Sequence, residues 1–312
     1  MQDAELPYPL VQEGDLMLNA LLTDLLDAGY NDLFCTRDSR LEKSHIMIET
    51  INSGKNIWQL WKNCMNECDA VWIIAPETAG VLSDLTRMSE QCGCMVLGCT
   101  PAAIKLATSK QKTLEFLAKK QIPHVPVIKD FTDLSDQSSG WVIKPDDGVG
   151  ADACYLFTDQ YSLHQYISEL GQEKIVVQEY IHGIPASISM VCHEGKTVVL
   201  GCNQQLFTFN NGKGRLNGII VNGLHKFIGQ FTNIAEQIGT VVNGLSGYVG
   251  IDLIIADQGP LVLEINPRLT TAYAGLRQSL DCNPAELIIS VIKNGQFPVM
   301  PEYKYYPVTV NL

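Results

Sequence analysis

The stretch GIDLIIADQGPLVLEINPR (residues 250–268) carries the pattern from which the fold of this chain is predicted. Two apolar runs flank a short glycine turn, which is typical of a β-hairpin. Side chains two positions apart in a strand face the same way, so Glu264, Asn266 and Arg268 are expected on one face and Leu263 on the other. An apolar strand therefore carries a carboxylate, an amide and a guanidinium on one face.

These polar side chains suit a metal and phosphate site. Asp252 lies on the preceding strand and is expected to reach the same face as Glu264 and Asn266. Carboxylate and amide oxygens are hard ligands, suited to Mg²⁺ that also contacts substrate phosphates. Arg268 suits a bidentate hold on phosphate or carboxylate. The alternative is a structural ion pair between Glu264 and Arg268 at a strand end, and this pattern alone leaves both interpretations open.

A second element is WVIKPDDGVGAD (residues 141–152), a predicted strand and tight turn. A lysine at the end of a strand, followed by small residues, can direct its ammonium and several backbone N–H groups at one phosphate group. The segment contains neither GK[ST] nor GxGxxG, the usual phosphate-loop and dinucleotide patterns. An ordinary hairpin turn is the more common explanation of such a segment taken alone.

Two further segments are weaker signals. SKQKT (residues 109–113) begins a predicted helix, where lysines oppose the helix dipole unless an anion binds there; a solvated helix face is the alternative. VVQEYIHG (residues 176–183) is a strand that leaves the core and meets a break. Its backbone groups and apolar side chains suit the edge of an adenine ring, although nothing in these residues alone requires that ligand.

Length and composition restrict the class of protein. A chain of 312 residues is expected to form about two domains. Hydrophobic content of 46% includes no apolar run of membrane-spanning length, so no membrane partner is expected. The net charge of −12 opposes binding to nucleic acid, so any phosphate must be held by a local site. The first residues lack the pattern of a secretory signal, and a cytoplasmic location is expected.

The ten cysteines are scattered without the paired spacing of a disulfide framework, so reduced thiols are expected. Cys92 and Cys94, with Cys99, raise the alternative of a metal site. Their apolar neighbours and the lack of a second Cys/His cluster favour packing as small side chains.

The first hundred residues alternate between short apolar runs and segments of helix length, which predicts a parallel, doubly wound sheet. An amphipathic helix over residues 16–28 comes before the first apolar run, so the usual first strand is missing, by truncation or by design. Further along, the glycine-rich segment NNGKGRLNG (residues 210–218) is predicted to be a loop. Other predicted strands cover residues 32–36, 70–76, 94–100, 141–144 and 175–180, with a hairpin around Glu194-Gly195.

In this order and spacing, the four elements resemble the nucleotide and metal site of the ATP-grasp superfamily. The resemblance covers about residues 100–275, and the preceding portion is similar to that family's N-terminal domain. It implies an ATP-grasp fold, α/β overall and α+β in the ATP-binding part, with an N-terminal parallel-sheet domain that lacks its first strand. The implied division is an N-terminal domain (1–103), a central subdomain with the phosphate loop (104–183) and a C-terminal subdomain with the metal site (184–312).

The resemblance also implies a role for each matching position. Lys110 and Lys144 would contact the ATP phosphates, under a loop over residues 148–152 that includes Gly148, Val149 and Gly150. The adenine hinge would consist of Gln178, Glu179, Tyr180 and Ile181. Asp252, Glu264 and Asn266 would bind one or two Mg²⁺ ions, with Mn²⁺ as an alternative metal. Arg268 would hold the acyl phosphate or the acceptor carboxylate and, with Lys144, would be catalytic.

Some positions depart from the family pattern. The acidic residue that usually binds ribose is replaced by Pro185, which puts the ribose contact in doubt. Ala151 and Asp152 stand in the phosphate loop where smaller residues are common, so loop closure is expected to be less free. Lys213 and Arg215, in the glycine-rich segment, are candidates for substrate contact, with solvated loop charges as the alternative. Phe209 and Tyr273 are candidates to line a slot for an aromatic ring.

The resemblance implies an ATP-dependent ligase that activates a carboxylate as an acyl phosphate and couples it to an amine, with small-molecule substrates. Within the superfamily, EGDLMLNALLTDL, KPDDGVG and EINPRLTTAYAGL look most like the tyramine–glutamate ligase group, whose members make a furan cofactor precursor. The alternatives are another amino-acid or dipeptide ligase of the D-alanine type and an ATP-binding regulatory protein without catalysis. A homodimer is expected only by analogy with the superfamily.

Overall fold

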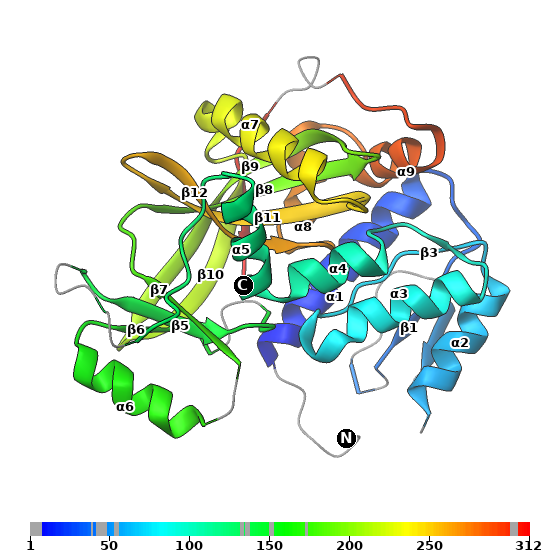
Figure 1. Cartoon of the computed structure of the whole chain (residues 1–312). Coiled ribbons are helices and arrows are strands. Elements are labelled where there is room, and N and C mark those ends of the chain that lie inside the picture. The colour runs from blue at the N-terminus through cyan, green and yellow to red at the C-terminus, as the bar shows by residue number, and fades with distance from the viewer. Residues whose placement is uncertain are drawn as a thin grey trace.

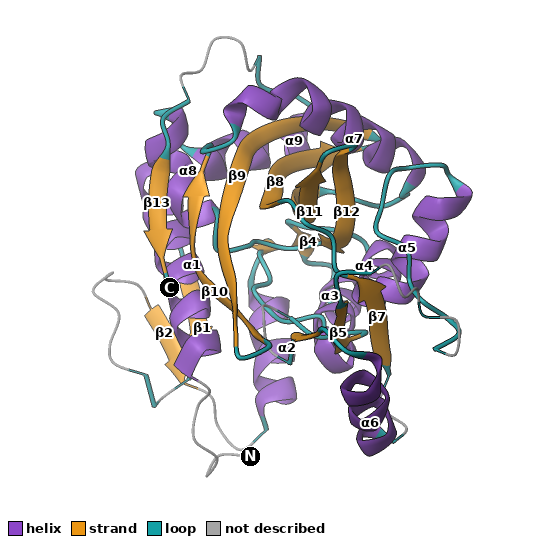
Figure 2. Cartoon of the chain, turned by 90° about the vertical axis from the view of Figure 1, so that its left-hand side faces the viewer, coloured by secondary structure: helices purple, strands orange, loops and turns teal. Residues whose placement is uncertain are grey.

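The computed structural model describes residues 8–38, 40–41, 49–52, 56–131, 134, 138–149, 153–171, 174–299 and 305–312. A curved, nine-stranded sheet is its largest feature, with strand order β12-β11-β8-β9-β10-β6-β5-β7 and β13 paired to β10. Figure 2 shows the first part of this sheet as a continuous wall between layers of helices. Its neighbouring strands run antiparallel, so short turns suffice to connect several of them.

Elements follow one another along the chain in three groups. The first group contains α1 (Tyr8–Asp27), β1 (Phe34–Arg37), β2 (Glu49–Asn52), α2 (Ile57–Glu67), β3 (Ala70–Val71), η1 (Thr78–Gly80), α3 (Val81–Gln91), β4 (Met95–Val96) and α4 (Pro101–Thr108). The second contains α5 (Lys110–Lys119), β5 (Trp141–Pro145), β6 (Tyr155–Phe157), α6 (Gln160–Leu170) and β7 (Ile175–Glu179). The third contains β8 (Ile184–His193), β9 (Lys196–Asn210), β10 (Lys213–Val221), η2 (His225–Phe227), α7 (Ile228–Val241), β11 (Gly247–Ala256), β12 (Gly259–Asn266), α8 (Tyr273–Leu280), α9 (Pro284–Asn294) and β13 (Val308–Asn311).

Helices pack on both faces of the large sheet. One core joins α4, α5 and α7 to the sheet and includes Leu117 and Phe231, both fully buried. The other core joins α1, α8 and α9 to the opposite face and includes Leu276 and Ile288. Figure 1 shows α7 lying over β8 and β9, whereas α6 covers β5 and β6 at the other end of the molecule. Helices on both faces leave β8 and β11 almost entirely buried, and most of their side chains are apolar.

The N-terminal group contains parallel strand pairs, as expected. β1 pairs with β2 and β3 pairs with β4, and in the described part of the chain each pair forms a sheet of its own. Helix α1 precedes them and is fixed by buried polar contacts: Arg37 pairs with Asp15 at 2.6 Å, and the Tyr273 hydroxyl donates to Asp24 at 2.8 Å. The group is therefore tied to the C-terminal part of the chain through α1.

The predicted hairpins are confirmed, and one predicted loop is wrong. β8 and β9 meet at Glu194-Gly195, and β11 and β12 meet at the predicted Gln258-Gly259 turn. Residues 210–218 are not a loop, because β9 continues to Asn210 and β10 begins at Lys213. Only a two-residue turn separates them, and β9 pairs with β10 along the segment despite its glycines. Among the described residues, no helix combines the length and apolarity that crossing a membrane requires.

Replacing Leu117 with alanine tests the core beneath α5. The side chain is fully buried, so we expect a loss of about 2–5 kcal/mol in the free energy of unfolding. Chemical denaturation monitored by circular dichroism measures this loss. Lys119→Ala, at an exposed position of the same helix, is the control and should change stability by less than about 0.5 kcal/mol. Equal effects of the two changes would contradict the packing described.

Candidate active site

A cavity of about 520 Å³ lies between the strands of the second group and those of the third. It is lined by most of the residues that the sequence singled out. These are Lys110, Lys144, Gly148, Gln178, Glu179, Tyr180, Ile181, Asp252 and Glu264. Val149, Asn266 and Arg268 lie outside the lining, and Gly150 lies outside the described residues. The structure thus gathers the predicted hinge, both lysines and both carboxylates around one space.

The two carboxylates form the floor of the cavity. Asp252 on β11 lies directly opposite Glu264 on β12, and the Asn266 amide donates to Asp252 at 3.3 Å. Gln205 donates to the other Asp252 oxygen at 2.9 Å. The expected alternation fails at Leu263, which also lines the cavity. A β-bulge is the reason, because the pairing passes from Asp252 with Glu264 to the next residue with Val262 and leaves Leu263 as the extra residue.

Burial and neighbouring charges shift the pKa values of these carboxylates. Lys110 Nζ lies 3.1 Å from Glu264 Oε2. Burial disfavours the charged form of Glu264, but the charges of Lys110 and Lys144 outweigh the effect of burial and lower the pKa of Glu264 to about 2. Burial and the neighbouring Glu264 charge raise the pKa of Asp252. Burial also lowers the pKa of Lys144, with Lys110 acting in the same direction and Glu264 opposing it. The floor is a compact set of opposed charges.

Lys110 begins helix α5, as predicted, and its side chain turns back toward the phosphate loop. Ser109 caps the helix by accepting from Lys112 N at 3.2 Å. The Lys110 ammonium donates to the Gly148 carbonyl at 2.5 Å, which brings this lysine to the loop after β5. Asp146 in that loop accepts from Gln111 N at 2.9 Å, so a carboxylate already lies at the start of α5.

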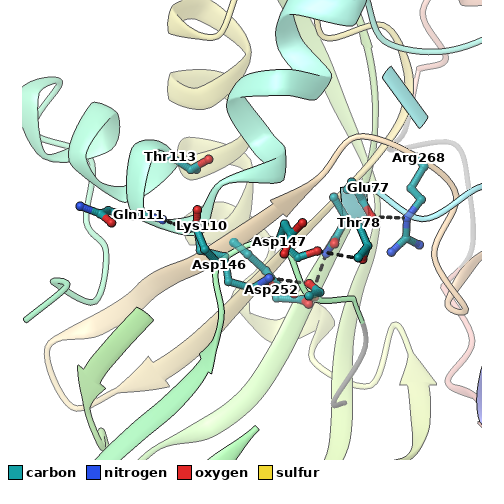
Figure 3. A network of polar contacts seen from close by, with 12 residues as sticks. Glu77, Thr78, Lys110, Gln111, Thr113, Asp146, Asp147, Asp252 and Arg268 are labelled. Carbon is teal, nitrogen blue, oxygen red and sulfur yellow. Dashed lines mark hydrogen bonds and ion pairs between the residues drawn. The ribbon is translucent and has the colours of Figure 1, made fainter. Parts of the chain in front are cut away.

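The same loop is held from the N-terminal side. The backbone carbonyl of Asp147 accepts a hydrogen bond from the Thr78 hydroxyl at 2.9 Å. The Asp147 carboxylate accepts a hydrogen bond from Ala79 N at 3.1 Å. Figure 3 shows this chain of contacts from Gln111 through Asp146 and Asp147 to Thr78. Sequence reasoning missed these contacts. Thr78 and Asp147 lie 69 positions apart, and no motif marks the pair.

Arg268 points away from the cavity floor and toward the N-terminal part. Its Nε donates to Glu77 Oε2 at 2.9 Å, and its Nη1 donates to the Leu269 carbonyl at 3.0 Å. Glu264 forms its ion pair with Lys110, and Arg268 forms its ion pair with Glu77. The structure therefore does not support the alternative of a structural ion pair between Glu264 and Arg268. Burial disfavours the charged guanidinium, yet Glu77 raises the pKa of Arg268. No sequence motif predicted a role for Glu77.

The hinge and its surroundings form the apolar end of the cavity. Gln178 is buried and donates to the Val125 carbonyl at 2.7 Å, and Tyr180 N donates to the Gly140 carbonyl at 2.8 Å. Phe207 and Phe209 lie on the facing strand, with ring centroids 5.1 Å apart. This arrangement gives one end of the cavity the flat, apolar walls that an aromatic base requires. Pro185, which replaces the usual acidic position, also lines it.

Three other predicted contacts lie elsewhere. Tyr273 is buried and bonded to Asp24, so it does not line the cavity, unlike Phe209. Lys213 and Arg215 are exposed on β10 and are absent from the cavity lining. No disulfide joins cysteines in the described part of the chain, and no group of three or more His, Cys, Asp or Glu side chains there could hold a metal.

Two carboxylates and an amide nevertheless fit a divalent cation that is shared with a phosphate. Asp252 and Glu264 are directly paired and partly buried, and their mutual repulsion contributes to the raised pKa of Asp252. A cation between them would remove that repulsion. Asn266 lies within hydrogen-bond distance of Asp252, and its amide oxygen is a third hard donor. Since the protein supplies so few ligands, phosphate oxygens and water must complete the coordination.

Comparisons with known proteins agree with this arrangement. The family model of the ATP-grasp domain matches residues 107–272, and that of the pre ATP-grasp 3 domain matches residues 31–104. A tyramine–L-glutamate ligase from Methanocaldococcus jannaschii is 29% identical over 298 residues, which are 92% of this chain and 85% of that protein.

Solved structures share the fold. A protein from Archaeoglobus fulgidus that is assigned to the ATP-grasp superfamily superposes with a TM-score of 0.66 at 20% identity, covering 96% of this chain and 94% of that one. The biotin carboxylase domain of a Hydrogenobacter thermophilus 2-oxoglutarate carboxylase, in complex with MgADP, ADP and bicarbonate, gives a TM-score of 0.75 at 13% identity, covering 93% and 70%.

Thr78→Val tests whether the phosphate loop is held from the N-terminal side. Loss of the hydroxyl that donates to the Asp147 carbonyl should raise amide hydrogen exchange over residues 145–149 by about 5-fold, corresponding to about 1 kcal/mol. Mass spectrometry of peptides covering this loop measures the effect. Thr23→Val removes a hydroxyl that bonds only within α1 and serves as the control. Unchanged loop exchange in Thr78→Val would refute the proposed anchoring.

Proposed function

This chain belongs to the ATP-grasp family and is an ATP-dependent carboxylate–amine ligase, and we propose that its substrates are glutamate and tyramine. The observation that carries the proposal is the single cavity in which two lysines and two carboxylates lie at one end and apolar side chains at the other. The relative at 29% identity supports this choice of substrates, since that protein is named tyramine–L-glutamate ligase. We also propose that the chain consists of an N-terminal domain, a central subdomain and a C-terminal subdomain, with boundaries after residues 103 and 183.

ATP would lie along the length of the cavity. Adenine would occupy the apolar end, beside the backbone of Glu179, Tyr180 and Ile181 and opposite Phe207. The phosphates would extend toward Lys110 and Lys144, which both line the cavity near Glu264. Gly148 and Val149, at the start of the phosphate loop, would lie over them, and residues 150–152 of that loop lie outside the described residues. In this pose the Lys110 ammonium would exchange its contact with the Gly148 carbonyl for a phosphate oxygen.

Asp252, Glu264 and Asn266 would hold one or two Mg²⁺ ions, and Mn²⁺ has the same preference for oxygen ligands. When bound, the metal would neutralise phosphate charge and orient the terminal phosphoryl group. Glu264 is suited to this role because nearby lysines keep it ionised. Gln205 and Asn266 fix the orientation of the Asp252 carboxylate through hydrogen bonds to its two oxygens.

The reaction brings several negative groups together. A glutamate carboxylate attacks the γ-phosphorus of ATP, the bond from that phosphorus to the bridging oxygen breaks, and ADP leaves with the electron pair. The tyramine nitrogen then attacks the acyl carbon, loses a proton and displaces inorganic phosphate. Lys110, Lys144 and Arg268 would offset the accumulated charge, so their contribution is positioning and electrostatic stabilisation.

Arg268 would bind the carboxylic acid substrate or its acyl phosphate. It follows the metal-binding strand by two residues, and Glu77 fixes its Nε. The guanidinium keeps 13% of its side-chain surface accessible, which leaves room for a contact with an acyl phosphate or carboxylate. Proteins that bind ATP only for regulation have no need of such a group beside a metal floor. This placement favours catalysis over the regulatory alternative.

Measurement of phosphate release from MgATP tests the function. Purified protein is given glutamate plus tyramine, each compound alone, and a panel of other amino acids with and without amines. We expect release only when both partners are present, with the amide product identified by mass. Release with D-alanine alone would identify a dipeptide ligase instead. ATP binding without release under every pair would contradict the ligase assignment.

Glu264→Gln tests the metal floor. The change keeps the size of the side chain but removes a charge that neighbouring lysines hold ionised, so we expect kcat to fall by about 10³-fold or more. The apparent Mg²⁺ requirement should rise, while nucleotide binding measured by calorimetry should partly persist. Glu236→Gln, at an exposed position of α7, is the matched control. Turnover equal to that of the control would contradict the assignment of Glu264.

A further inference from the structure

Two cysteines of the N-terminal part lie in direct contact. Cys68 Sγ lies 3.2 Å from Cys94 Sγ, a distance at which either thiol can donate a hydrogen bond to the other. Cys99, which lies near Cys94 in the sequence, is instead buried and donates to the Ser246 carbonyl at 3.3 Å. We call Cys68 and Cys94 the thiol pair. This pair differs from the group of three cysteines that sequence spacing suggested.

The backbone brings the thiol pair together at the start of two paired strands. Cys68 follows α2 directly and comes before β3, and Cys94 comes just before β4. The strands are parallel, with Ala70 opposite Met95, and Met95 N donates to the Asp69 carbonyl at 2.9 Å. Neighbouring strands lie about 4.8 Å apart, which suits the backbone separation of a disulfide. A sulfur–sulfur bond of about 2 Å therefore requires each sulfur to move by roughly 0.6 Å.

The two thiols differ in their access to solvent. Cys94 is 5% exposed, whereas Cys68 is partly exposed. Burial raises the pKa of Cys94 to about 12, and the hydrogen bond and charge of Cys68 add to this shift. A small oxidant therefore reaches Cys68 first. Once Cys68 is captured, its hydrogen bond and charge no longer oppose ionisation of Cys94, which lies beside the sulfur that it can attack.

A third cysteine lies close by. Cys92 contributes to the raised pKa of Cys94 through its charge, and its own thiol donates to the Lys62 carbonyl at 4.0 Å. Three neighbouring thiols raise the alternative of a metal site. In the part of the chain that the structure describes, however, no group of three or more His, Cys, Asp or Glu side chains could hold a metal. The direct contact within the thiol pair favours redox chemistry instead.

We propose that the thiol pair is a modification site, at which Cys68 and Cys94 form a reversible disulfide in response to a small-molecule disulfide such as oxidised glutathione. The Cys68 thiolate attacks one sulfur of the oxidant, the disulfide of the oxidant breaks, and one glutathione thiolate leaves. Cys94 then loses its proton, attacks Cys68 Sγ and displaces the second glutathione. Two protein thiols are oxidised while one oxidant disulfide is reduced to two thiols, and an excess of reducing thiol reverses both steps.

The disulfide would enclose the unit that anchors the phosphate loop. The thiol pair spans 26 positions, and the chain between its members contains β3, η1 and α3. Thr78 and Ala79 in this unit donate to Asp147, and Glu77 accepts from Arg268. Closing a loop of this size lowers the conformational entropy of the unfolded chain. Oxidation would therefore stabilise the unit against unfolding.

The bond would form away from the cavity. Cys68 and Cys94 lie outside the cavity lining, at the opposite ends of β3 and β4 from the segment that holds Thr78. Figure 1 shows α2, α3 and β3 on the side of the molecule opposite β5 and β6. The inference does not depend on the proposed substrates, because it concerns the stability of the N-terminal part and not the reaction.

Peptide mapping without reduction tests the proposal. Native protein is equilibrated with mixtures of reduced and oxidised glutathione, free thiols are alkylated, and the peptides are identified by mass. We expect a linked pair of peptides that contains Cys68 and Cys94, at least about 10-fold more abundant than any other linked pair, because contact raises the effective concentration of the two thiols. Dithiothreitol should abolish it. A glutathione adduct at Cys68 that never gives the link, a link through Cys92, or an unmodified Cys68 would each overturn the inference.

Single substitutions separate the two steps. Cys94→Ser should accumulate the glutathione adduct at Cys68, whereas Cys68→Ser should leave the buried Cys94 with at least about 10-fold less adduct. Cys282→Ser removes a partly exposed thiol between α8 and α9 and is the matched control, in which the link should form as in wild type. Equal adduct formation in the two thiol-pair variants would overturn the proposed order of attack.

Thermal unfolding followed by circular dichroism provides a readout that needs no substrate. The oxidised wild type should unfold at a temperature about 5 °C or more above that of the reduced protein. This difference should vanish in Cys94→Ser and persist in Cys282→Ser. Equal unfolding temperatures of the linked and reduced forms would overturn the stabilising role of the disulfide. A failure of the ligase assignment would leave both readouts, and therefore the inference, unaffected.

Discussion

The pairing of Asp252 with Glu264, both partly buried at the cavity floor, is the constraint on which the rest of the site depends. Two carboxylates in direct register repel each other, and burial magnifies that repulsion because water no longer screens it. The chain meets this cost in two ways: Lys110 and Lys144 favour the ionised form of Glu264, whereas burial and the Glu264 charge raise the pKa of Asp252 and so favour its neutral form. These lysines come from different elements, one helical and one extended, so α5 and β5 must both reach the floor of the cavity. The surrounding sheet holds them there.

A second constraint follows from how the phosphate loop is fixed. Asp146 lies against the start of α5, and Asp147 lies against the segment before α3. The loop is thus fastened both to its own part of the chain and to the N-terminal part. Glu77 lies in that same segment and orients Arg268, so nucleotide and acid contacts share one short stretch of backbone. In this stretch of backbone, Ala79 adopts a positive φ of 54°, a conformation that non-glycine residues seldom hold without a functional or structural cause.

Sequence reasoning was successful where local pattern and contact coincide. Local sequence patterns predicted the β11–β12 hairpin, the strand end at Lys144 and the helix start at Lys110, because turn or capping residues mark where each element begins or ends. The structure places all three around one cavity. The Glu77–Arg268 pair could not be predicted, because 191 positions separate its members and neither belongs to a common motif. Glycine and asparagine around residue 212 suggested a loop, whereas pairing with β9 imposed a strand.

The extra residue at Leu263 sets a limit on how the chain can change over evolution. Each residue added to or removed from β12 exchanges its inner and outer faces, because strand side chains alternate with a period of two. The bulge already absorbs one such residue, so Glu264 and Val262 both keep their correct faces. Removing Leu263 itself would restore a regular ladder, in which Glu264 still pairs with Asp252 and Val262 still pairs with Leu253. Divergent copies of this hairpin can therefore lose the bulge at the expense of one cavity-lining side chain, whereas a residue added or removed between Glu264 and Asn266 would separate these two side chains onto opposite faces.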